Sequence, residues 1–183
     1  MYQDIIFLYI CNCLIIFFLL ELSLPYFSPL YDKKEISEVK FCAKEKMNYA
    51  LSHYSKKYLM KEYLNVTNET YVNDLWRKTS NCLDKSIVYE SYDIVKGNNV
   101  VAYVLMTYIY QNNIYIMKKR FKNMVIEDKA SVLIHECTHL AWGSNDYAYI
   151  HEYKKFNNLR GNLAIKNADS HTLVIDMLSM FSC

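Results

Sequence analysis

Residues 127–143 read EDKASVLIHECTHLAWG, and this stretch decides how the rest of the chain is interpreted. Apolar side chains surround its polar centre, which predicts a buried helix over Glu127–Trp142. Gly143 follows directly, and glycine commonly ends a helix. Buried charge is costly unless it is paired or bound to a metal, so polar residues inside such a helix need a reason.

The polar centre of this helix has the spacing of a zinc site. His135 and His139 are four residues apart, so a helix places both imidazoles on one face, one turn apart. Two imidazoles in that position can bind one Zn²⁺ ion, and Glu136 on the flank can take a proton from a bound water. Cys137 points away from that face and is interpreted as a small buried residue. The alternative is a helix with two ordinary histidines and a surface glutamate, since a five-residue pattern also arises by chance.

A catalytic zinc site needs a third protein ligand and one open position. A histidine six residues after His139 would suit, but Asn145 stands there. Asp146 and Glu152 are the candidates that remain. Asp146 comes just beyond Gly143, where the chain can turn back towards the metal, so it is the better placed of the two.

Two further segments resemble a known family. Residues 143–149, Gly-Ser-Asn-Asp-Tyr-Ala-Tyr, resemble a Gly-Thr-x-Asp-Tyr-x-Tyr motif of the deuterolysin and peptidyl-lysine metalloendopeptidase family, the aspzincins. Residues 167–171, Asn-Ala-Asp-Ser-His, are similar to the Asn-Ala-Asp segment that follows there. The resemblance is specific over Lys129–His171 and extends more weakly upstream.

The resemblance implies a zincin-like metallopeptidase fold and one role for each matching residue. It implies zinc ligands at His135, His139 and Asp146, with Glu136 as the general base. Tyr149 would donate a hydrogen bond to the developing oxyanion, where a fixed donor stabilises charge. Packing is the ordinary alternative for a tyrosine in this Tyr-rich chain.

Asp169 carries the implied substrate preference. In the family this aspartate lines the pocket for the residue after the scissile bond and favours lysine, whereas without the family Asp169 or Ser170 would be a helix N-cap. Thr172 stands where lysine-selective members carry a second acid, so strict selectivity is not expected. Ile150 replaces a family glycine. His151 and His171 are interpreted as solvent-facing or hydrogen-bonded in loops, with a position behind the metal ligands or against the substrate as the alternative.

The remaining elements complete an α+β arrangement. Three- and four-residue spacing predicts a helix from an N-cap at Ser37 to the polar stretch Asn65–Thr70, and a second helical region over Tyr71–Val95. Val100–Tyr110 and Ile114–Met117 are rich in β-forming residues and predict a hairpin, with turns at residues 96–99 and 111–113. One or two helices over residues 153–181 close the chain.

The first thirty residues differ from the rest. Ile5–Leu20 is almost wholly apolar and predicts a secretory signal, with an uncleaved membrane anchor or a buried helix as the alternatives. Two glycosylation patterns, at Asn65 and Asn68, agree with export. Export permits disulfides, and Cys42 with Cys82 is the expected pair. We therefore expect residues 31–183 to be a single catalytic domain, secreted and monomeric.

Composition limits the possible partners. The formal net charge of +2 is too small to indicate nucleic-acid binding, and contact with a membrane is expected only if the leader stays attached.

The predicted function is a zinc endopeptidase acting on proteins or peptides. One alternative is a catalytically weak secreted protein that keeps the fold and binds a partner. Another is an anchored structural protein whose motif is coincidental.

Overall fold

The computed structural model describes residues 29–53, 56–91, 100–105, 112–159 and 161–179. Its helices, in chain order, are α2 (Lys33–Ser52), α3 (Lys56–Leu59), the π-helix η2 (Met60–Leu64), α4 (Glu69–Lys85), α5 (Lys118–Lys122), α6 (Ile126–Trp142), α7 (Tyr153–Asn157), α8 (Asn162–Ile165) and α9 (Ala168–Leu178). Its strands are β1 (Ile87–Ser91), β2 (Ala102–Val104) and β3 (Asn113–Met117). The α+β prediction, mainly helical with a small sheet before the motif helix, is confirmed.

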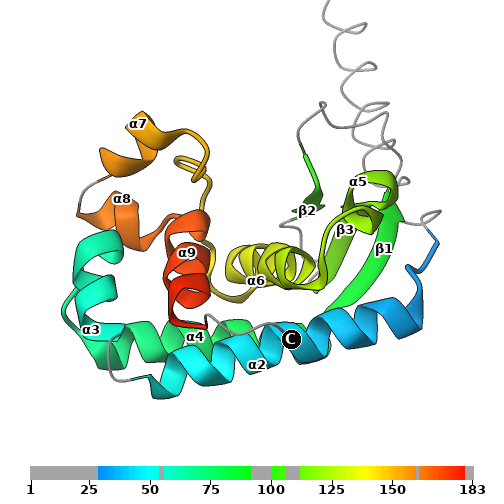
Figure 1. The fold of residues 1–183 in the computed structure, drawn as a ribbon, viewed down its shortest axis with the longest axis horizontal. Helices are drawn as coiled ribbons and strands as arrows, with labels where there is room; N and C mark the ends of the chain where they lie inside the picture. The colour runs from blue at the N-terminus through cyan, green and yellow to red at the C-terminus, as the bar shows by residue number, and fades with distance from the viewer. Residues whose placement is uncertain (1–28, 54–55, 92–99, 106–111, 160, 180–183) are drawn as a thin grey trace, which may run out of the picture.

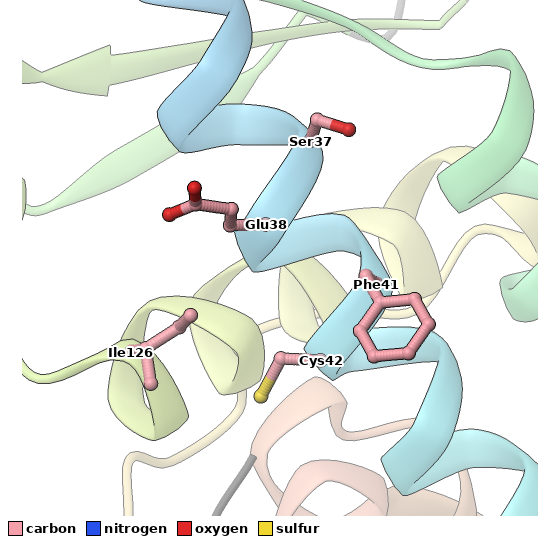
Figure 2. A pocket seen from close by; sticks show the side chains of 5 residues that line it. All are labelled: Ser37, Glu38, Phe41, Cys42 and Ile126. Carbon is pink, nitrogen blue, oxygen red and sulfur yellow. The ribbon is translucent and has the colours of Figure 1, made fainter.

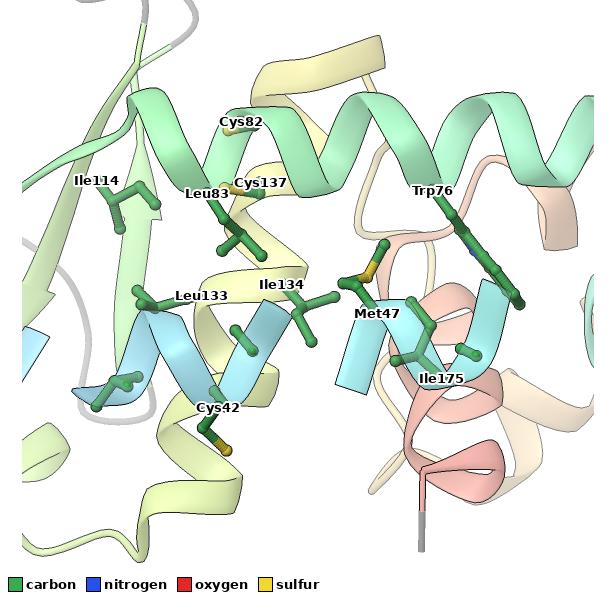
Figure 3. Packing of buried hydrophobic residues seen from close by; sticks show 14 of the residues in the cluster. Cys42, Met47, Trp76, Cys82, Leu83, Ile114, Leu133, Ile134, Cys137 and Ile175 are labelled. Atoms are coloured by element: carbon green, nitrogen blue, oxygen red, sulfur yellow. The ribbon is translucent and has the colours of Figure 1, made fainter. Parts of the chain in front are cut away.

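Helix α6 lies at the centre of the described structure (Figure 1). Helices α2 and α4 run beneath it, the sheet covers one side and α9 packs on the other. Apolar side chains from all of these elements meet around α6, among them Met47, Trp76, Leu83, Leu133 and Ile134 (Figure 3). These five side chains are fully buried. The core therefore holds α6 firmly on the faces that carry no metal-binding residue.

The sheet has the strand order β1-β3-β2, with β3 in the middle. Strands β2 and β3 pair antiparallel, as the predicted hairpin requires, with Tyr103 opposite Tyr115. Strand β1 pairs with β3 in parallel, with Val88 opposite Ile114. Strands β1 and β2 are therefore both edge strands of the described sheet, and β2 packs against α6. The predicted turn at residues 96–99 lies outside the described residues.

The second helical region was predicted too long. Helix α4 ends at Lys85, and Ile87–Ser91 forms β1 instead of continuing the helix to Val95. Backbone pairing with β3 explains the difference, since Val88 is buried in the sheet and the backbone amide of Ile87 donates to the carbonyl of Asn112 (2.8 Å). Whether such a short segment with β-branched residues becomes a strand depends on its pairing with another strand. The local spacing of apolar residues does not reveal that pairing.

The first helix also differs from its predicted bounds. It begins at Lys33 because the Asp32 carboxylate accepts hydrogen bonds from the amides of Lys34 (2.9 Å) and Glu35 (3.0 Å), so Asp32 and not Ser37 is the N-cap. It ends at Ser52, and α3 and η2 follow separately. In the described part of the closing region there are three helices, α7, α8 and α9, where one or two were expected.

The expected disulfide between Cys42 and Cys82 is wrong. Cys82 is a free buried thiol, and so is Cys137. These two side chains face each other between α4 and α6 (Figure 3), and burial together with Cys82 raises the pKa of the Cys137 thiol. Cys42 is disulfide-bonded. Burial of Cys137 in the core agrees with its interpretation as a small packing residue.

The leader predicted in residues 1–30 lies almost entirely outside the described residues. Within the described part of the chain, no helix is both long and apolar enough to span a bilayer.

His171 is a buried α9 residue and not the solvent-facing or loop residue expected from the sequence. The Trp76 indole donates to its Nδ1 (3.0 Å), and its Nε2 lies 2.7 Å from the carbonyl oxygen of Ile165. Because Nδ1 accepts, the ring is the neutral tautomer with hydrogen on Nε2. Burial lowers the pKa of His171 to about 4, although the Ile165 hydrogen bond opposes the shift.

This buried histidine predicts loss of stability in acid. The pKa of histidine is about 6.5 in the unfolded chain, so between about pH 6.5 and pH 4 the unfolded state binds the extra proton. The contribution of His171 is complete above that range and falls by up to about 3 kcal/mol as the pH drops through it. We expect His171→Gln, which cannot titrate, to have a flatter dependence of unfolding free energy on pH. Urea titrations with zinc chelated measure this, and equal slopes for both proteins would contradict it.

Candidate metal centre

Three predicted ligands meet at one point, two of them on α6 and one in the loop that follows it. His135 Nε2 and His139 Nε2 are 3.1 Å apart. Oδ1 of Asp146 lies 3.1 Å from His135 Nε2 and 3.2 Å from His139 Nε2. One nitrogen or oxygen from each residue therefore forms a nearly equilateral triangle. Glu152, the other candidate for third ligand, instead accepts from the backbone amide of Tyr149 (3.1 Å).

This triangle has the dimensions that zinc requires. Zinc binds histidine nitrogen and carboxylate oxygen at about 2.0–2.2 Å in tetrahedral sites, which separates neighbouring ligand atoms by about 3.3 Å. The three observed separations fall close to that value, and His135, His139 and Asp146 form a group able to hold a metal ion. Three protein ligands also leave a fourth position open, as a catalytic site needs.

The end of α6 explains how Asp146 reaches the histidines. Gly143 adopts a left-handed conformation (φ 74°) that ends the helix, and its amide donates to the His139 carbonyl (3.0 Å). The next residues turn back and join the start of α9. The amide of Asn145 donates to the carbonyl of Lys166 (2.8 Å), and the amide of Ala168 donates to the carbonyl of Asn145 (3.0 Å). This bridge fixes the backbone beside Asp146.

Each histidine is also held through its second ring nitrogen. Nδ1 of His139 lies 2.9 Å from the carbonyl oxygen and 3.0 Å from Oγ of Ser144. Nδ1 of His135 lies 2.7 Å from Oδ1 of Asp169. A proton on each Nδ1 leaves both Nε2 atoms unprotonated and directed at the metal position.

Glu136 and Tyr149 border the same pocket, which has a volume of about 310 Å³. Residues Ala102, Tyr103 and Val104 of β2 also line this pocket. Glu136 is buried, whereas Tyr149 is 39% exposed. The Tyr149 hydroxyl donates to Oδ2 of Asp146 (3.1 Å), and burial together with Asp146 raises the pKa of Tyr149. The phenol therefore stays protonated and able to donate.

When no metal is bound, the two histidine ligands hold protons more tightly than usual, and Asp146 stays ionised. Burial lowers the pKa of His135, but hydrogen bonds to Asp146 and Asp169 outweigh it and raise that pKa to about 10. The pKa of His139 is raised through Asp146 against the effect of burial. The pKa of Asp146 is lowered because the two histidines stabilise its charge against the cost of burial. The negative potential that holds these protons also attracts a divalent cation.

A second pocket lies on the surface of α2 and is unlike the first. Ser37, Glu38, Phe41, Cys42 and Ile126 line it (Figure 2). It offers one carboxylate and no histidine, and Cys42 is already in a disulfide. This lining has no set of groups suited to hydrolysis.

Comparison with known proteins assigns the family. Residues 40–175 match the family described as lysine-specific metallo-endopeptidase, aspzincin. The chain belongs to the aspzincin family. The aspzincins are metallo-endopeptidases, so the activity is peptide-bond hydrolysis and the substrates are proteins or peptides. No curated protein matches the sequence. The match includes α2 from Lys40 onwards, the sheet and the motif helix, which argues against a coincidental motif.

Sequence reasoning missed two contacts of this aspzincin site. Asp169 was predicted as a lysine-binding residue or an N-cap, but the structure places it against His135, and Asn167 occupies the N-cap position of α9. Asn167 is fully buried, and its side-chain oxygen accepts from the amides of Tyr147 (2.9 Å) and Ala148 (3.1 Å). A histidine that binds a metal through one ring nitrogen almost always donates a hydrogen bond from the other nitrogen. That general rule could have predicted a partner such as Asp169 for His135.

Proposed function

We propose that this aspzincin is a zinc endopeptidase in which Glu136 is the general base. The observation that carries the proposal is the triangle of His135, His139 and Asp146, with sides of 3.1–3.2 Å. Zinc bound there would lower the pKa of a water to about 7 and polarise the scissile carbonyl.

The remaining residues have separate roles in this proposal. Glu136 accepts the proton of the attacking water and delivers it to the leaving amine, as general acid–base catalysis requires. Tyr149 donates to the carbonyl oxygen as it becomes negative, which requires its hydroxyl to leave Asp146. The substrate lies in the pocket between α6 and the edge strand β2.

We propose a preference for lysine after the scissile bond. The pocket lining contains the carboxylates of Glu136 and Asp146 and, among described residues, no lysine or arginine. Asp169 is not among these lining residues and lies against His135 (2.7 Å), so its sequence-based role as the contact for the lysine ammonium stays a prediction. The family description names the same preference.

The proposal is tested with the full chain by metal analysis and digestion of a lysine-containing protein. We expect one zinc per chain, cleavage that stops with a chelator and returns with zinc, and new N-termini that begin mainly with lysine. Absence of bound zinc would contradict the proposal. Bound zinc without cleavage would favour the alternative, a partner-binding protein that retains the fold.

We also propose that the protein is secreted as a monomer. The apolar stretch Ile5–Leu20 supports export, and both Asn65 and Asn68 are exposed, so a glycan could be attached to either. Asn65 ends η2 in a left-handed conformation, whereas the Asn68 side chain caps α4 by accepting from the Tyr71 amide (3.1 Å). Expression in a glycosylating eukaryotic host checks this, and retention of unglycosylated protein inside the cells would contradict it.

A further inference from the structure

Both carboxylate oxygens of Asp169 are in use inside the protein. Oδ1 lies 2.7 Å from Nδ1 of His135, and Oδ2 accepts from the backbone amide of Ile150 (2.8 Å). The Asp169 side chain is only 15% exposed. A carboxylate held in this way is positioned by the fold before any substrate arrives.

The start of α9 holds Asp169 in that position. Asn167 is fully buried and joins the loop to α9, because its amide nitrogen donates to the carbonyl of Ala148 in the loop (3.0 Å) and to Oγ of Ser170 in α9 (3.1 Å). Its oxygen accepts from the amides of Tyr147 and Ala148, as described above. The segment that carries Asp146 and Tyr149 is therefore attached to the segment that carries Asp169.

We propose that Asp169 is a positioning residue that orients His135 towards the metal and ties the Tyr149 loop to it. The inference rests on the proposed zinc site and extends it. Oδ1 keeps the Nδ1 proton of His135 in place, so Nε2 stays available as the ligand atom. Oδ2 holds Ile150, the residue after Tyr149, so a single carboxylate sets the positions of a ligand and of the proposed oxyanion donor.

The two histidines differ in the charge of their partners. His139 is oriented by the neutral carbonyl and hydroxyl of Ser144, whereas His135 is oriented by a carboxylate. A carboxylate makes the ligand more basic and strengthens its bond to the metal, and loss of such a partner typically costs about 10–100-fold in metal affinity. Asp169 should therefore affect zinc affinity even when no substrate is present, which a residue that only contacts substrate would not do.

The test measures zinc affinity of the full-length protein by competition with a chromophoric chelator, without substrate. We expect Asp169→Asn to weaken zinc binding about 10–100-fold, because the amide can accept from His135 or from Ile150 but is no longer charged. Asp169→Glu keeps the charge but displaces it by one methylene, and we expect an intermediate affinity. Asp74→Asn is the matched control, since Asp74 pairs with Lys78 on the surface of α4. It should bind zinc as the wild type does.

The outcomes separate this inference from the proposed function. A wild type that binds no zinc would contradict the proposed function itself. A zinc-binding wild type whose Asp169→Asn and Asp169→Glu variants bind zinc equally well, but lose lysine preference, would overturn the positioning role. Unfolding midpoints measured with zinc chelated show whether each variant is folded, and only folded variants are compared. A folded Asp169→Asn protein with weakened zinc binding supports the inference.

Discussion

Replacing Glu136 with glutamine is expected to lower kcat by about 10²–10⁴-fold while zinc remains bound. Glutamine has nearly the same size and shape, so it fills the buried position of Glu136 without a cavity. Its amide cannot accept the proton of the attacking water at neutral pH. The three ligand atoms belong to other residues, so the metal should stay in place.

The experiment compares kcat and zinc content for the wild type, Glu136→Gln and a matched control. Glu127→Gln makes the same chemical change in the first turn of the same helix, away from the pocket lining. We expect the control to cleave at about the wild-type rate. A Glu136→Gln protein that holds one zinc and keeps more than a tenth of wild-type kcat would rule out Glu136 as the general base.

The sequence was most informative where short-range geometry decides the structure. A four-residue spacing on a helix necessarily brings His135 and His139 together, and Gly143 necessarily allows the chain to leave the helix in a left-handed turn. Asp146 follows that turn and reaches the histidines as predicted. These features depend on residues within a dozen positions of one another, so one sequence suffices to predict them.

The features that were missed depend on contacts between distant segments. Strand β1 exists because it pairs with β3, and Asp169 contacts His135 across 34 positions of sequence. The free thiol of Cys82 faces Cys137 only because α4 packs on α6. Periodicity and motif spacing carry no information about such pairings, which arise when the core assembles.

Replacing Asp146 with alanine is expected to weaken zinc binding by at least about 100-fold and to abolish cleavage. Asp146 supplies one of only three protein ligand atoms, whereas loss of a partner behind a ligand already costs about 10–100-fold. The substitution also removes the negative charge that raises the pKa of His135 and His139. The metal thus loses a direct bond and the favourable potential around it.

The loss can be measured as stabilisation by zinc, without any substrate. At a free zinc concentration 100 times its dissociation constant, the wild type should gain about 2.7 kcal/mol of unfolding free energy, and a variant that binds 100-fold more weakly should gain only about 0.4 kcal/mol.

The double variant Asn145→Asp/Asp146→Ala is the sharper comparison, because it restores the net charge one residue away. The backbone of Asn145 is tied to Lys166 and Ala168, so a carboxylate at that position cannot take the place of Asp146. We therefore expect no recovery of zinc binding, and recovery would show that charge near the histidines matters more than the position of the ligand.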